Sequence, residues 1–355
     1  MPQEPGEVVP DAAVPAAARP PVWRHVRRTA LLGVTAVSLY LVAPSLLTVL
    51  DAWPQLGDVQ PWWFAVVLLL QAASFASLWG LLRIALRNST WPEVASSQLA
   101  SNAASRIIPG GAATGSVVQA TMLVRSGHRP AEVGGALGAT GLLTTGMLMT
   151  LPVLAVPAVL TGKSLPRELE VGLVASLVVA ALLVGIGFAV LTWDRVVQVL
   201  ARGVGAVVAL VRRSASAPLV AARVVAERDR VAAAFEGRWL RALAAAAGNR
   251  MFDYATLVAA LLAVGADVRP SLVLVAYVAA VALGLVPVTP GGLGFVETGL
   301  AGLLVVAGAP TDQALAGTLL YRLASYWLPI PVGGVAYLLF RHYRSGQQDQ
   351  HRSRG

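Results

Sequence analysis

The chain has 355 residues, of which 56% are hydrophobic and only 13% are charged, and its mean hydropathy is +0.69. Soluble globular domains carry about 25% charged residues, so this composition excludes most soluble classes and indicates a membrane protein. Cysteine is absent, which excludes disulfides, thiolate metal sites and cysteine nucleophiles. The net charge is +9, and Lys163 is the one lysine. The arginines lie in short stretches between long apolar runs, a pattern typical of membrane topology signals and not of nucleic-acid binding.

The N-terminal residues 1–22 are rich in proline and alanine, which predicts a disordered tail. Residues 29–50 form the first apolar run that is long enough to span the roughly 30 Å hydrocarbon core of a bilayer. Later runs of sufficient length are 61–82, 133–160, 170–193, 239–265, 271–289 and 314–340. We therefore expect an all-α polytopic membrane protein, with about 6–8 transmembrane helices in a domain over residues 23–344 and a polar tail over 345–355.

Basic residues predict the orientation of the chain in the membrane. Arginines precede the first apolar run, and placing them inside leaves Lys163, Arg167 and Arg269 as the basic residues of the outside loops. The positive-inside rule therefore predicts a multi-pass protein of the cell membrane with both termini in the cytoplasm. The long inside segment 194–238 is basic and amphipathic. It either lies along the anionic leaflet surface or forms a solvated helical hairpin between two halves.

Two apolar stretches are interrupted by the same tripeptide, Pro109-Gly110-Gly111 and Pro290-Gly291-Gly292, and the copies are 181 residues apart. Proline removes a backbone donor and glycine frees the backbone, so each tripeptide is expected to end a helix. Lipid tolerates such a break only inside protein or beside a water-filled cavity. In the predicted topology the segment 93–124 starts and ends inside, whereas the segment 271–308 starts and ends outside. The pair is a candidate inverted repeat, an arrangement that places broken helices around a transport site.

The first arms of the two broken segments differ in polarity. Residues 96–106 are rich in serine and end on Arg106, which favours a re-entrant hairpin packed inside the protein. Residues 271–289 are apolar and long enough to cross the bilayer fully. Charge bias does not separate a hairpin of two spans from a re-entrant pair, because both begin and end on the same side, so both alternatives stay open.

Five charged residues fall within or beside apolar runs: Arg106, Arg250, Asp253, Glu297 and Arg322. An ionised side chain at the bilayer centre costs about 2.5–3.5 kcal/mol on the insertion scale, so each needs a partner or a cavity. Arg250 and Asp253 are three residues apart on one helix, and we expect them to pair locally. Glu297 and Arg322 have no local partner of opposite charge. This favours either a transport or gating role or a structural ion pair between helices.

Two C-terminal stretches, Thr289-Pro-Gly-Gly-Leu-Gly-Phe-Val-Glu297 and Tyr321-Arg-Leu-Ala-Ser-Tyr-Trp-Leu-Pro-Ile-Pro-Val-Gly333, resemble the signature of the lysylphosphatidylglycerol synthase transmembrane (flippase-like) family. The resemblance covers roughly residues 29–343, and the stretch after Ile108 is a looser match. It implies a polytopic inner-membrane domain that moves lipids or lipid-linked intermediates between leaflets. Full-length synthases of the family carry a soluble aminoacyl-transferase domain after the membrane part, whereas this chain ends eleven residues after Arg344. We therefore do not expect lipid aminoacylation.

The candidate substrate-binding residues surround the two breaks and the C-terminal motif. They are Arg106, Pro109, Gly110, Gly111, Pro290, Gly291, Gly292, Gly294, Glu297, Arg322 and Tyr326. The arginines can make bidentate contacts with a phosphate, and the helix that begins after Gly292 adds free N–H groups and a positive dipole end. Glu297 can neutralise an arginine in the empty state, release it to phosphate or carry a coupling proton.

These residues predict a translocase for an anionic phospholipid or lipid-linked intermediate. The four histidines are scattered, so we expect no metal, and we expect no cofactor and no catalytic residue. The expected partners are anionic membrane lipids and a separate synthase or glycosyltransferase, with no nucleic acid. Two alternatives stay open. One is a membrane-embedded lipid-modifying enzyme that uses Glu297 as acid and base, and the other is a non-transporting partner of a synthase.

Overall fold

The computed structural model describes residues 59–108, 111–155, 233–284 and 294–352, together with isolated residues between 171 and 229. All regular elements in these ranges are helices, which confirms an all-α membrane protein. The predicted tail 1–22, the run 29–50, and most of the run 170–193 and the linker 194–238 lie outside the described residues.

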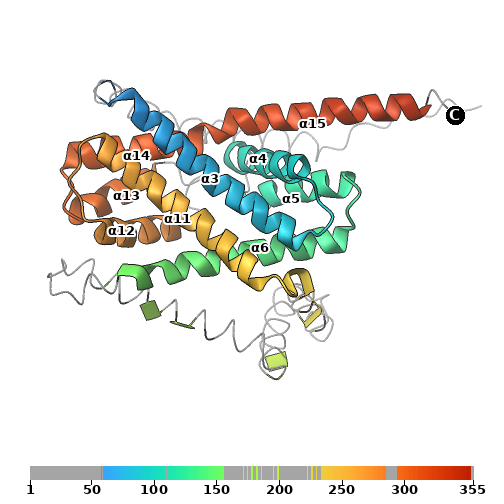
Figure 1. Ribbon diagram of the computed structural model, residues 1–355, viewed down its shortest axis with the longest axis horizontal. Helices are drawn as coiled ribbons and strands as arrows, with labels where there is room; N and C mark the ends of the chain where they lie inside the picture. The colour runs from blue at the N-terminus through green and yellow to red at the C-terminus, as the bar shows by residue number, and fades with distance from the viewer. Residues whose placement is uncertain are drawn as a thin grey trace, which may run out of the picture.

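Nine α-helices and two shorter helical segments make up the described ranges (Figure 1). The α-helices are α3 (Pro61–Ala85), α4 (Trp91–Ile107), α5 (Gly111–Arg125), α6 (Pro130–Thr150), α11 (Trp239–Ala263), α12 (Pro270–Leu283), α13 (Phe295–Val306), α14 (Thr311–Arg322) and α15 (Pro329–Arg352). A 3₁₀ segment, η1 (Leu151–Ala155), follows α6, and a π-helical segment, η3 (Leu323–Trp327), joins α14 to α15. Within these ranges, α3, α6 and the continuous stretch Thr311–His342 are long and apolar enough to cross a membrane.

Helices α3 and α11 form the central pair of the bundle, and they run antiparallel (Figure 1). Both are 25 residues long. Near their midpoints, the Ser74 hydroxyl donates to the Asn249 carbonyl at 2.9 Å, and the Asn249 side-chain amide donates to the Ser74 carbonyl at 3.1 Å. The Asn249 amide is also 3.0 Å from the Ser74 hydroxyl. Both side chains are buried, so this reciprocal contact satisfies polar groups that would otherwise be left unpaired in the interior.

Each long helix is followed by two short helices on either side of a Pro-Gly-Gly break. Helices α4 and α5 have 17 and 15 residues, and α12 and α13 have 14 and 12. A full span needs about 20 residues. Helix α12 ends at Leu283 and is only about 21 Å long, which of the two expected alternatives favours a re-entrant pair over a full crossing by residues 271–289. Both broken segments are pairs of short helices.

The two halves also share one helix-ending turn. The His128 amide donates to the Leu123 carbonyl after α5, and the Ala309 amide donates to the Leu304 carbonyl after α13. The intervening glycines, Gly127 and Gly308, have φ angles of 100° and 101°, values that glycine adopts without strain. All three positions are displaced by 181 residues, the same spacing as the two tripeptides. The internal repeat therefore extends through α5 and α13 into the turns that end them.

The repeat is inverted, because its equivalent long helices α3 and α11 are antiparallel. In Figure 1 the pair α4 and α5 lies beside the C-terminal end of α3, and the pair α12 and α13 lies beside the C-terminal end of α11, at the other side of the bundle. The bundle has two buried clusters, each built from helices of both halves, and the equivalent residues Leu123 and Leu304 are fully buried in one cluster each.

Candidate functional site

Arg106 stands at the C-terminal end of α4 and reaches the π-helical segment η3. Its guanidinium donates one hydrogen bond to the Tyr326 carbonyl and a second, at 2.8 Å, to the Ser325 carbonyl. The guanidinium carbon also lies 4.5 Å from the centre of the Tyr326 ring. Arg106 therefore connects the tip of the first broken segment to the C-terminal motif, 220 residues further along the chain.

The local sequence explains why these carbonyls are free to accept the arginine. In an α-helix the Ser325 carbonyl would accept from the amide of residue 329, but Pro329 has no N–H. In the wider π register, where the Leu328 amide donates to the Leu323 carbonyl at 2.9 Å, the Tyr326 carbonyl would need the amide of Pro331. Pro329 thus removes the α-helical donor of the Ser325 carbonyl, and Arg106 donates to this carbonyl and to that of Tyr326.

Arg322 and Glu297 form an ion pair between α14 and α13. The Arg322 Nε donates to the Glu297 Oε1 at 2.8 Å, and the Arg322 Nη2 lies 2.7 Å from the same oxygen. The side chains are only 11% and 14% exposed. The Arg322 guanidinium carbon lies 4.3 Å from the centre of the Tyr326 ring, so the aromatic ring contacts both arginines. The predicted interhelical pairing is therefore present, and it lies within a cluster of two cations and one anion.

Several polar atoms of this cluster and its surroundings have no hydrogen-bond partner in the described part of the chain. They are the second carboxylate oxygen of Glu297, the Tyr326 hydroxyl and the Thr318 hydroxyl. Glu297 and Thr318 both line a groove of about 360 Å³ between α13 and α14. Buried polar groups are usually paired, so these atoms mark a place that is suited to a polar ligand.

The helix breaks are only partly described. Pro109, Gly110, Pro290, Gly291 and Gly292 lie outside the described residues. Gly111 opens α5 with a φ of 54°, and Gly294 precedes α13 with a φ of 76°. Helix α13 thus begins at Phe295, slightly later than expected, and Glu297 lies in its first turn, where the helix dipole stabilises a negative charge.

Arg250 and Asp253 do not pair as we expected. The Arg250 Nε donates to the Thr144 carbonyl at 3.1 Å, on α6. The Asp253 Oδ2 accepts from the Tyr277 hydroxyl at 2.7 Å and from the Tyr321 hydroxyl at 3.0 Å. The partners lie on other helices of the bundle, α6 for Arg250 and α12 and α14 for Asp253. Asp253 and Tyr321, neither of which was predicted as a site residue, extend the polar cluster toward α11 and α12.

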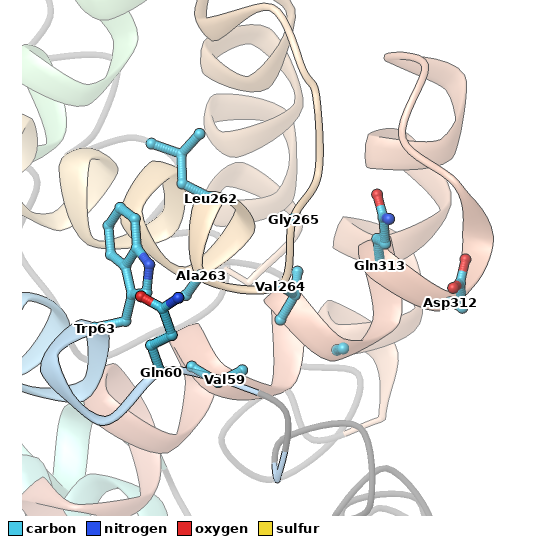
Figure 2. Close-up of a pocket in the computed structure, with 10 residues that line it drawn as sticks. Val59, Gln60, Trp63, Leu262, Ala263, Val264, Gly265, Asp312 and Gln313 are labelled. Atoms are coloured by element: carbon cyan, nitrogen blue, oxygen red, sulfur yellow. The ribbon is translucent and has the colours of Figure 1, made fainter.

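Two further hollows are related by the internal repeat. One has a volume of about 500 Å³ and is lined by Gln60 and Trp63 at the start of α3, Gly265 after α11, and Asp312 and Gln313 on α14 (Figure 2).

The other hollow has a volume of about 380 Å³ and is lined by the equivalent parts of the opposite halves. These are Ala233 and Ala234 before α11, Leu86 after α3, and Glu132 and Ala136 on α6. The antiparallel central pair therefore has a hollow at each end, and each hollow holds a carboxylate from the first turn of a helix.

A family model described as the lysylphosphatidylglycerol synthase TM region matches residues 30–333. The chain belongs to this family. The match covers the ion pair of Glu297 with Arg322 and both broken segments, so the resemblance expected from the C-terminal motifs is confirmed.

Relatives named UPF0104 membrane proteins match shorter stretches. The protein from Methanothermobacter thermautotrophicus is 32% identical over 93 residues, which are 26% of this chain and 26% of the relative. The protein from Pyrococcus horikoshii is 35% identical over 66 residues, which are 19% and 20% of the two chains. The chain thus matches about a quarter or less of the length of these relatives.

Proposed function

We propose that this member of the lysylphosphatidylglycerol synthase TM family is a translocase that moves anionic phospholipids or lipid-linked intermediates between leaflets of the cell membrane. The observation that carries the proposal is the convergence of both broken segments on one cluster, where Arg106 and Arg322 contact Tyr326 and Glu297 pairs with Arg322. Two arginines in a poorly hydrated site favour an anion, and their planar donors fit the oxygens of a phosphate.

In the empty site Glu297 neutralises Arg322. A phosphodiester that enters competes with Glu297 for Arg322. Arg322 then replaces its charge-assisted contact with Glu297 by one with the phosphate. The N-terminal end of α13 lies beside Glu297 and adds a fixed positive dipole end. Substrate binding therefore need not leave an arginine without an anionic partner, which keeps the electrostatic cost of an intramembrane anion low.

The internal repeat supports access from both sides. Inverted repeats place a site near the midplane between two halves that can open in turn. The two hollows at opposite ends of α3 and α11 support this part of the proposal, because they lie at equivalent places in the two halves. In this proposal both termini lie in the cytoplasm, and the protein is not an enzyme.

The test is leaflet exchange of headgroup-labelled phosphatidylglycerol in proteoliposomes at matched protein incorporation. We expect Arg322→Ala to slow exchange about tenfold to a hundredfold, because it removes charge-assisted hydrogen bonds of about 1.5–3 kcal/mol. Glu297→Gln should also slow exchange, since it leaves Arg322 unneutralised in the empty site. Arg125→Ala removes an exposed arginine at the end of α5 and serves as the matched control, with exchange unchanged.

Wild-type rates in both site variants would refute the site. The same vesicles separate the alternatives. A change in the mass of the labelled lipid would identify a lipid-modifying enzyme, and an absence of exchange with the folded wild-type protein would favour a non-transporting partner of a synthase.

A further inference from the structure

Asp253 is a carboxylate inside the bundle whose partners are tyrosines. Its Oδ2 accepts hydrogen bonds from Tyr277 on α12 and Tyr321 on α14. Tyr277 is fully buried and Tyr321 is 7% exposed. No cation lies within ion-pair distance of Asp253 in the described part of the chain. Intramembrane carboxylates are rare and usually functional, and the proposed translocation site leaves Asp253 without a role.

The contacts of Asp253 lead directly into the arginine cluster. Tyr321 precedes Arg322, and its hydroxyl also interacts with the Ser325 side chain. The Ser325 carbonyl in turn accepts from Arg106. Arg106 lies within electrostatic range of Arg322, Tyr321 and Asp253. Asp253, Arg106, Arg322 and Glu297 therefore belong to one polar network that connects α11, α4, α14 and α13.

The formal charges of this network are balanced when it is empty. Arg106 and Arg322 contribute two positive charges, and Glu297 and Asp253 contribute two negative charges. A phosphodiester adds a negative charge to a site that is largely shielded from water. An added anion favours the protonated form of a nearby carboxylate, because the protonated form no longer repels it.

Glu297 and Asp253 differ in their ability to take that proton. Glu297 has Arg322 at 2.7 Å and lies in the first turn of α13, and both features stabilise its ionised form. Asp253 has two neutral phenol donors. Arg106 from α4 lies within electrostatic range of Asp253. Arg250, three residues earlier on α11, gives its Nε to the Thr144 carbonyl. Asp253 is therefore the carboxylate of this network that has no cation in direct contact.

We infer that Asp253 takes up a proton when an anionic headgroup binds beside Arg106 and Arg322, so that the substrate crosses as a neutral complex. The inference rests on the proposed function, because it requires a headgroup at that site. Transport of the lipid is then coupled to protons, because each anionic lipid that binds carries about one proton with it. A monoanionic phosphodiester is the substrate class that one such carboxylate can balance.

The experiment is calorimetric titration of the purified full chain in detergent with dihexanoyl phosphatidylglycerol, in two buffers of different ionisation enthalpy. The titration gives the affinity and the number of protons taken up. We expect about one proton per lipid for the wild type, and an affinity that weakens with rising pH by up to about tenfold per pH unit. Asp253→Asn should still bind but take up almost no protons, and its affinity should vary little with pH.

One further variant is the matched control. Asp267→Asn removes an exposed carboxylate just after α11 and should behave as the wild type. The inference is overturned by binding without proton uptake in the wild type or by continued uptake in Asp253→Asn. Failure of the wild type to bind the lipid at all would instead refute the anionic headgroup site.

Tyr277→Phe covers the case in which Asp253→Asn does not fold. It removes one hydrogen bond to the Asp253 carboxylate and keeps the carboxylate itself. A carboxylate that loses a donor protonates more easily, so the pH midpoint of lipid-linked proton uptake should move upward. An unchanged midpoint in folded Tyr277→Phe would contradict the assignment of the proton to Asp253.

Discussion

The two halves of the molecule share a backbone plan and differ in chemistry. In the first broken segment, α4 and α5 are held by polar contacts, and the Gln119 amide donates to the Gln98 side-chain oxygen at 2.6 Å. In the second, buried positions on α12 are almost all aliphatic, and Tyr277 is the exception that reaches Asp253. The repeat offset places Ser116 where the second half has Glu297. The site is therefore asymmetric although its scaffold is nearly two-fold symmetric.

This difference indicates how an inverted repeat acquires a function. The features that the halves share are backbone features: a break, a short helix and a glycine turn. The charged groups enter from positions that are not equivalent, Arg106 at the end of α4 and Glu297 at the start of α13. Shared positions should therefore control stability, and unshared positions should control transport.

The largest expected effect on stability is at the contact between α15 and α4. A Cβ on Gly333 would overlap the Leu99 carbonyl, which is backbone and cannot move away, whereas a Cβ on Gly334 meets nothing within 4 Å. Gly333→Ala should destabilise the protein by about 1–3 kcal/mol through overpacking. Gly334→Ala should be neutral or slightly stabilising. Thermal unfolding in one detergent compares the neighbours, and equal melting temperatures would contradict the close approach of the two helices.

A smaller and matched effect is expected at the two equivalent turns. Gly127→Ala and Gly308→Ala each place a side chain at a positive φ, at a cost of about 1–2 kcal/mol. The two losses should agree, because the turns have the same hydrogen bonds. Gly134→Ala, inside α6 and with open space at its Cβ, is the control and should not lower the melting temperature. Loss in only one turn variant would show that the halves differ in stability as well as in chemistry.

The sequence predicted the features that depend on local backbone chemistry. The Pro-Gly-Gly tripeptides indicated the helix breaks, and their 181-residue spacing indicated the repeat. The length of the apolar run 271–289 was misleading, because hydropathy continues past Leu283 while the helix does not. Asp253 was assigned to Arg250 because only its own helix was considered, and its partners Tyr277 and Tyr321 are 24 and 68 residues away.

The junction of Arg106 with η3 depends on the π-helical turn and could not be read from charge spacing. Pro329 was its one local signal, since it removes the α-helical backbone donor of the Ser325 carbonyl. The residues that the site needs were largely predicted. Their geometry was not, because it depends on contacts between helices that are far apart in the chain.

The smallest expected effect is the most direct test of the asymmetry. Ser116→Glu places a carboxylate at the position that is equivalent to Glu297, and Ser116 is exposed, so the change should alter stability by less than about 0.5 kcal/mol. We expect Ser116→Glu combined with Glu297→Gln to exchange labelled phosphatidylglycerol as slowly as Glu297→Gln alone. The reason is that Arg322, the partner of Glu297, belongs to α14 and has no arginine counterpart on α6. Recovery of exchange in the double variant would mean that a carboxylate on α5 can replace the one on α13. The equivalent position in the repeat would then matter more than the ion pair of Glu297 with Arg322.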